Sequence, residues 1–255
     1  MSVSPARSYL DATLNKPLTV RFTPATKAVV SHGLMLFNKE GKLLVIRRAH
    51  SYGFSSFVSL ILGTETTEIP LAIACERLLT EVTPDELTIV RENWSEVGLE
   101  PIMKKVLDMM TDYSYLQITK RYFQRNFEEY RKPITERWKS ILKTVNISKI
   151  KPGDQARIHD FPKGRGNGQF CLKRVIYSAH AEAGLHLKDN VTYKGWYSVS
   201  YTASNNICYR LSLVGAVCSD LTLSRPYLSW ISLGDLKVLP EIATIVTSAK
   251  KRCFQ

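Results

Sequence analysis

The chain has 255 residues, 44% of them hydrophobic, so it is long enough to bury a substantial core. Its 35 Lys and Arg residues outnumber 23 Asp and Glu residues, and the net charge of +12 favours a polyanionic partner, either nucleic acid or an anionic membrane surface. No apolar run approaches the ~20 residues that a bilayer crossing requires, so a membrane-spanning protein is excluded and a soluble protein is expected.

The five cysteines are odd in number and widely spaced, and no two of them have the spacing of a zinc site. A disulfide framework is therefore not expected, and reduced thiols indicate a cytoplasmic protein. The first residues also lack the apolar segment of a signal peptide.

The first predicted element after an N-terminal arm, residues 1–27, is a β-hairpin. Two apolar runs between residues 28 and 48 flank the segment Asn-Lys-Glu-Gly, in which Gly41 supplies the positive-φ position of the turn. Arg47 and Arg48 place two guanidinium groups at the end of the second strand. The next apolar run, residues 51–62, fits either a strand or a loop.

Residues 70–145 change to helical spacing and are predicted to form a helical insertion. Thr83 and Glu86 have the spacing of a capping box, and Gly98 is the expected stop of that helix. Pro133 is expected to break a later helical run over residues 115–145.

One helical stretch of this insertion interleaves basic and aromatic residues. This pattern fits either an RNA-binding face or an ordinary amphipathic helix whose aromatic side chains are core. The residues are Lys120, Arg121 and Arg125 with Tyr122, Phe123 and Phe127.

After residue 145 the chain returns to short elements. A glycine-rich loop and a helix occupy residues 159–187, two strand-like segments follow, and a short strand precedes a terminal helix. We therefore predict an α+β fold in which residues 28–69 and 146–255 form a mixed sheet flanked by helices, interrupted by the helical insertion.

Four stretches, in this order, resemble the Nudix superfamily, in particular the mRNA-decapping proteins of poxviruses and African swine fever virus. They are "LLVIRRAHSYGFSSFV", "TPDELTIVRENWSEVG" with "YFQRNFEEYRKPITERW", "FPKGRGNGQFCLKRVI" and "SWISLGDLKVLPEIATIVTSAKK". The resemblance spans roughly residues 28–250. It implies a Nudix-like sheet, RNA or capped mRNA as the ligand, viral or virion proteins as further partners, and a location in host cytoplasm or a virion.

The Nudix box carries several glutamates on one helix, which bind Mg²⁺ or Mn²⁺ and activate a water. Aligned on Gly184-Leu185, this chain keeps one of them, Glu182, whereas an alignment on "CLKRVI" puts Arg174 over the box arginine and keeps none. Glu182 is therefore the candidate catalytic and metal-binding residue, and impaired hydrolysis is expected. Acids elsewhere in the chain and His180 as a base keep an active enzyme open; those acids are Asp160, Asp189, Asp220 and Glu241.

The anion-binding half of such a site is retained. Lys163 and Arg165 lie in a glycine-rich loop before a helix, where free backbone N–H groups favour phosphate. The predicted RNA- or phosphate-binding residues are Arg47, Arg48, Lys163, Arg165, Lys120, Arg121 and Arg125.

These residues are compatible with three functions. The first is a Nudix-like viral protein that binds RNA or a capped or phosphorylated nucleotide with impaired hydrolysis. The second is an active, metal-dependent diphosphohydrolase that removes mRNA caps, and the third is a virion or scaffold protein that uses the fold for protein contacts.

Overall fold

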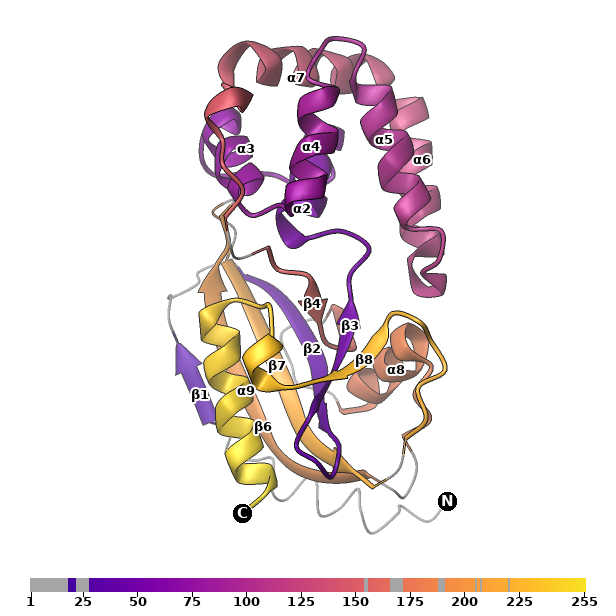
Figure 1. Ribbon diagram of the computed structural model, residues 1–255, viewed down its shortest axis with the longest axis vertical. Coiled ribbons are helices and arrows are strands. Elements are labelled where there is room, and N and C mark those ends of the chain that lie inside the picture. Colours follow the sequence, from indigo (N-terminus) through magenta and orange to yellow (C-terminus); the bar gives the residue numbers. More distant parts are fainter. Residues whose placement is uncertain are drawn as a thin grey trace. The chain divides into compact units, whose positions relative to one another are not determined.

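A computed structural model describes residues 18–21, 28–153, 156–165, 172–187, 191–204, 206, 208–219 and 221–255 (Figure 1). The chain divides into two compact units. Residues 1–47, 159–202 and 208–255 form what we call the sheet unit, and residues 48–158 with 203–207 form the helical unit. The fold is α+β, as predicted.

The sheet unit is built on a mixed sheet with the strand order β1-β6-β7-β2-β3-β4, in which β5 also pairs with β2 and β8 with β3. The pairs β1–β6 and β2–β7 are parallel, and the others are antiparallel. The strands are β1 (Leu18–Arg21), β2 (Ala28–Phe37), β3 (Leu43–Arg47), β4 (His159–Asp160), β5 (Lys163–Arg165), β6 (Val191–Thr202), β7 (Cys208–Cys218) and β8 (Leu228–Ile231).

The predicted hairpin is confirmed, although its strands stay paired only near the turn. Asn38 N donates to Lys42 O over 3.0 Å, and Gly41 N donates to Asn38 O over 2.9 Å. Gly41 has φ +71°, in the left-handed region that favours glycine. Farther along, β2 pairs with β5 in place of β3, so the hairpin opens and lets a distant segment into the sheet. On its other side β2 pairs with β7 along its whole length.

Two helices cover the sheet on opposite faces. Met35 and Phe37 of β2 are fully buried in a cluster with α9 (Pro240–Cys253). Because successive strand residues point to opposite faces, the fully buried Leu34 and Leu36 face the other side, where α8 (Leu172–Ala183) packs on β2 and β5. Both faces of the central strands are thus apolar, which explains their near-continuous hydrophobic runs.

The helical unit is a bundle with its own core, in which Trp138 is fully buried and contacts Trp94 edge to face. Gly53 permits a close crossing, since a Cβ there would lie 2.5 Å from Leu78 O. The elements are α2 (Tyr52–Leu62), α3 (Leu71–Thr80), α4 (Pro84–Glu92), α5 (Leu99–Met109), η1 (Ser114–Leu116), α6 (Gln117–Glu129), α7 (Arg131–Thr144) and η2 (Ile147–Lys149); the sheet unit adds η3 (Leu233–Asp235).

The helical unit begins earlier in the chain than the predicted insertion. The stretch expected as strand or loop is helix α2, so that expectation is wrong. Ser51 caps its N-terminus by accepting a hydrogen bond from Phe54 N, and Gly63 with φ +72° ends it. The unit therefore starts at Arg48 rather than at residue 70.

The break near Pro133 lies earlier than predicted. Helix α6 ends at Glu129, and α7 begins at Arg131 with Pro133 inside its first turn. The first-turn N–H groups of a helix have no partner within it, so a proline there costs little. Helix α4 likewise ends at Glu92, and Gly98 instead precedes the first residue of α5.

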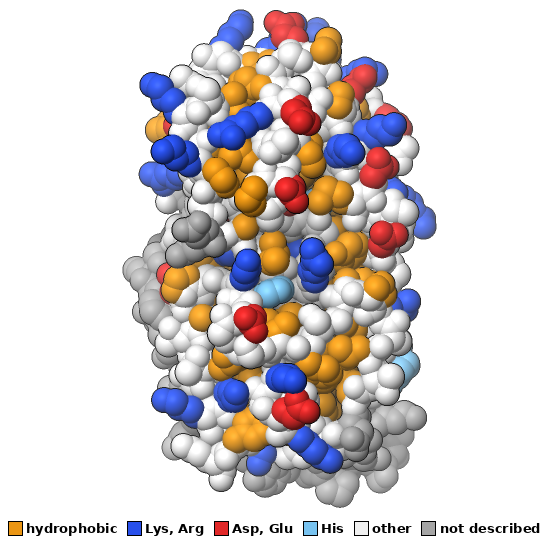
Figure 2. Space-filling view, viewed as in Figure 1, with side chains coloured by type: hydrophobic (Ala, Val, Ile, Leu, Met, Phe, Trp, Pro, Cys, Tyr) orange, Lys and Arg blue, Asp and Glu red, His pale blue; other side chains and the backbone are white. Residues whose placement is uncertain are grey.

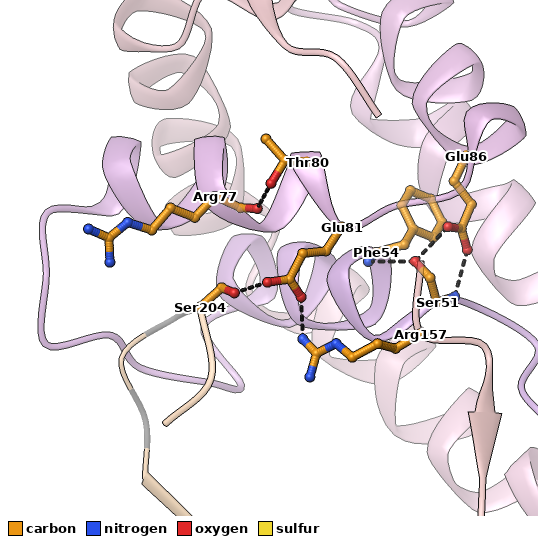
Figure 3. A network of polar contacts seen from close by, with 8 residues as sticks. All are labelled: Ser51, Phe54, Arg77, Thr80, Glu81, Glu86, Arg157 and Ser204. Carbon is orange, nitrogen blue, oxygen red and sulfur yellow. Dashed lines mark hydrogen bonds and ion pairs between the residues drawn. The ribbon is translucent and has the colours of Figure 1, made fainter. Parts of the chain in front are cut away.

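The predicted capping box of Thr83 and Glu86 is confirmed. Its glutamate also contacts Ser51, the N-cap residue of α2 (Figure 3). Glu86 is 2% exposed, and its carboxylate accepts hydrogen bonds from Thr83 N over 2.8 Å, Ser51 N over 2.8 Å and Ser51 Oγ over 2.6 Å. One buried carboxylate thus joins the N-termini of α2 and α4.

Candidate phosphate-binding site

The glycine-rich loop folds back on the helix that follows it. Strand β5 pairs with residues 31–33 of β2, and α8 packs on both strands. A Cβ on Gly164 would lie 2.4 Å from Ser178 Oγ, so only glycine allows α8 to lie this close to β5. Ser178 and Glu182, one helical turn apart, thus face the same part of the loop.

Glu182, the candidate catalytic residue, is half-buried and binds the loop backbone. Its Oε2 accepts a hydrogen bond from Lys163 N over 2.9 Å, and Tyr227 Oη donates to its carbonyl oxygen over 3.1 Å. The carboxylate therefore helps to position β5 against the end of α8.

Asp160 is the acid from outside the helix that folding brings to this loop. Its Oδ1 lies 2.6 Å from Lys163 Nζ and also accepts a hydrogen bond from Phe161 N. The Lys163 ammonium thus already has a carboxylate partner, and a phosphate would have to compete with it. Of the other candidate acids, Glu241 lies in the first turn of α9, and Asp189 and Asp220 lie outside the described residues.

The donor set at this loop does not fit a Nudix-type metal cluster. Within the part of the chain that the structure describes, no three His, Cys, Asp or Glu residues are placed to share a metal ion. Mg²⁺ and Mn²⁺ favour several oxygen ligands, and here one Glu182 oxygen already accepts a backbone N–H. Among the described residues, this loop therefore offers the half-buried Glu182 carboxylate and the Asp160–Lys163 ion pair.

Arg47 lies in a cationic cluster that the sequence did not reveal. It pairs directly across β3–β4 with His159, so the two side chains share one face of the sheet. His159 Nδ1 accepts a hydrogen bond from Lys237 N over 3.0 Å, which leaves the ring proton on Nε2. Partial burial, Lys237 and Arg47 lower the pKa of His159, with Asp235 acting the other way, so the ring is neutral at pH 7 between two cations.

Arg48, the neighbour of Arg47 in sequence, belongs to the helical unit. Its guanidinium carbon lies 3.8 Å from the ring centroid of Tyr52, and its Nε donates to His50 O over 3.2 Å. Arg157 also lies over the Tyr52 ring, at 5.1 Å. Arg48 is thus engaged by side chains and backbone of its own unit, whereas Arg47 belongs to the sheet unit.

The predicted basic face of α6 divides between core and solvent. Phe123 is 9% exposed and packs in the helical core, whereas Tyr122 is exposed. Lys120 Nζ donates to Thr111 Oγ1 over 2.8 Å, and Arg125 lies 3.6 Å from the Glu129 carboxylate. Phe123 therefore belongs to the core, whereas Tyr122, Arg121 and Arg125 are exposed.

Arg165 and Lys163 end up in strand β5 rather than in an open loop. The backbone of Arg165 pairs with Ser31 of β2. The loop that follows, residues 166–171, lies outside the described residues. The phosphate site predicted at the N-terminus of the next helix falls in this loop.

The positive charge of the chain is concentrated in one unit. Residues 48–158 and 203–207 contain 16 Lys and Arg against 15 Asp and Glu, so the helical unit has a net charge of +1. The rest of the chain contains 19 against 8 and has a net charge of +11. The composition of the whole chain hides this difference in net charge, because each unit is made of separate stretches of the sequence.

No protein-family model matches the chain, and no curated protein matches it either. Among the described residues, no helix is long and apolar enough to cross a membrane.

Proposed function

We propose that the chain is a Nudix-like protein, similar to the viral decapping type, whose sheet unit binds RNA with little or no hydrolysis. The single observation that carries this proposal is the charge partition, +11 on the sheet unit and +1 on the helical unit. Cations on one unit raise the local concentration of a polyanion and release counterions from its phosphates.

The β5–α8 loop-helix supports the Nudix-like part of the proposal. A Pro-Lys-Gly strand followed by a helix that ends at Gly184, with Glu182 turned towards the loop, has the arrangement that the resemblance implies. Lys163, Asp160 and Glu182 form a hydrogen-bonded group that fixes the loop. We assign this group to positioning the loop for ligand binding.

The binding experiment measures the affinity of the full chain for fluorescein-labelled single-stranded RNA by anisotropy over a series of KCl concentrations. RNA binding through phosphates predicts a log–log slope steeper than about −2, the value for three contacts at roughly 0.7 each. Absence of binding at low salt would reject the proposed function.

Hydrolysis is tested separately with cap-labelled RNA and Mg²⁺ or Mn²⁺, comparing the wild type with Glu182→Gln. A general base contributes typically ~10²–10⁴-fold, so loss of the base and most metal ligands predicts turnover near background. Robust turnover that Glu182→Gln abolishes would favour an active decapping enzyme instead. The observation that supports this alternative is Asp160, a second carboxylate that lies at the same loop.

A further inference from the structure

We propose that single-stranded RNA binds the outer side of α8, where its bases stack on exposed tyrosine and histidine rings. This surface, which we call the α8 face, comprises Lys173, Tyr177 and His180 of the helix with His186 and Arg225 beside its C-terminal end. The inference rests on the proposed RNA function and assigns it to residues outside the RNA-binding set that the sequence predicted.

Helix α8 has one buried and one exposed side. The side that packs on β2 and β5 buries three apolar residues, Val175, Ala179 and Ala183. Positions 173, 177 and 180 are exposed and lie three or four residues apart, so they form a row on the opposite side of the helix. In Figure 2, where tyrosine is coloured as hydrophobic, hydrophobic side chains reach the visible surface over α8 and β8.

Three exposed rings define the α8 face. Tyr177 is 72% exposed, more than any other aromatic residue that the structure describes. His180 follows three positions later, and its ring centroid lies 4.5 Å from that of His186, which is also exposed. A single exposed tyrosine is ordinary on a protein surface, but a tyrosine followed by a pair of adjoining imidazoles is a platform. Unpaired RNA bases stack on tyrosine and histidine rings, because each base has a π face that pairing does not cover.

A cation lies near each end of this row of rings. Lys173 precedes Tyr177 by one helical turn. Arg225 lies at the other end, since a Cβ on Gly184 would be 3.5 Å from Arg225 Nε, and the segment before β8 runs beside α8 there (Figure 1). The distance along the helix from residue 173 to residue 184 is about 16 Å, so the two cations are placed to contact phosphates on either side of stacked bases.

The residue types on this side favour single-stranded RNA over a membrane. A helix that lies on a membrane exposes Leu, Phe or Trp, whereas the described exposed positions of α8 hold Lys173, Tyr177, His180 and Ala181. Amphipathic rings combined with cations are instead the residues on which single-stranded nucleic acids bind. The unit that carries α8 also has the net charge of +11, which attracts a polyanion to it.

The test uses the full chain and a fluorescein-labelled single-stranded RNA of about 20 nucleotides, long enough for one such site. Tyr177→Ala should weaken binding at least about fivefold with the salt slope of the wild type, because a stacked base releases no counterion. The matched control is Tyr130→Ala, the same substitution at a tyrosine of the helical unit that is 54% exposed, and it should leave the affinity unchanged.

A second variant tests the cations of the α8 face. Lys173→Gln/Arg225→Gln removes two phosphate contacts at roughly 0.7 each and should make the salt slope shallower by about 1.4. Its control, Arg77→Gln/Lys104→Gln, removes one arginine and one lysine at exposed positions of the helical unit and should leave the slope unchanged.

A duplex of the same length separates stacking from charge alone. Its bases are already paired and stacked, so unlabelled duplex RNA should compete less well than unlabelled single strand. Wild-type affinity in Tyr177→Ala, an equal loss in Tyr130→Ala, or equal competition by the duplex would overturn the α8 face while leaving RNA binding intact. Failure of the wild type to bind RNA at low salt rejects the proposed function together with this inference.

Discussion

Replacing Glu86 with alanine should destabilise the helical unit more than any surface substitution. The carboxylate accepts three hydrogen bonds, two from Ser51 and one from Thr83 N, and it is 2% exposed. Glu86→Ala leaves the backbone N–H groups of Ser51 and Thr83 without this acceptor. It removes both the glutamate of the capping box and the contact with Ser51 that Figure 3 shows.

The size of the effect follows from those bonds. A hydrogen bond to a charged group contributes about 1.5–3 kcal/mol, but bonds that share one carboxylate are not additive. We expect Glu86→Ala to lower the free energy of unfolding of the helical unit by about 4 kcal/mol. With a urea dependence of about 2 kcal/mol per molar, the unfolding midpoint falls by about 2 M.

The assay needs a probe that reports on this unit alone. Trp94 and Trp138 lie in the helical core, 5.1 Å apart, and Trp196 and Trp230 lie in the sheet unit. Fluorescence in a Trp196→Phe/Trp230→Phe background therefore follows the helical unit during urea unfolding.

The matched control is Glu92→Ala, an exposed carboxylate at the other end of α4, for which we expect a change within about 0.5 kcal/mol. Glu86→Gln, which keeps an acceptor oxygen but not the charge, should lie between the two. If Glu86→Ala shifts the midpoint no more than Glu92→Ala does, then the carboxylate does not join α2 to α4 and the reasoning fails.

Three further predictions test other contacts. Gly164→Ala should destabilise the sheet unit by about 1–3 kcal/mol in urea, and adding Ser178→Ala should restore most of it by removing the clashing Oγ. Burial lowers the pKa of His50 to about 4, so the unfolded chain takes up the proton first; the helical unit should lose up to about 3 kcal/mol as the pH falls from 6.5 to 4, and His50→Gln should flatten that profile. Burial raises the pKa of the Cys75 thiol to about 12, so iodoacetamide at pH 8 should label the half-buried Cys208 but not Cys75 in the native chain, as mass spectrometry would show.

Local sequence signals predicted the local structure well. The Asn38–Gly41 turn and the capping box of α4 depend on residues a few positions apart, and both are present. Helix α2 also has local signals, the cap Ser51 and the stop Gly63, yet its sequence was predicted as either a strand or a loop. Burial of Phe54 and its neighbours in the bundle decides the helix there.

The candidate site was harder to predict from the sequence, because its contacts join residues that lie far apart along the chain. Glu182 could be aligned to a motif, yet its bond to Lys163 N depends on how β5 folds back on α8. His159 and Lys237 lie 78 positions apart and are joined by two hydrogen bonds, from His159 N to Lys237 O and from Lys237 N to His159 Nδ1; neither residue belongs to a motif.

The close packing of the loop leaves little room for a carboxylate at position 178 of α8. In the alignment on Gly184-Leu185, the proposed Nudix resemblance places Ser178 over a glutamate of the box, and Ser178 Oγ lies 2.4 Å from the position that a Cβ on Gly164 would take. Ser178 is 6% exposed, so a longer, charged side chain there would be buried against the β5 backbone and would force the loop away. A loop that opened would also separate Lys163 N from Glu182. The close approach of α8 to β5 at Gly164 and Ser178 therefore disfavours a glutamate at position 178, which is a physical reason to expect little metal-dependent hydrolysis under the proposed function.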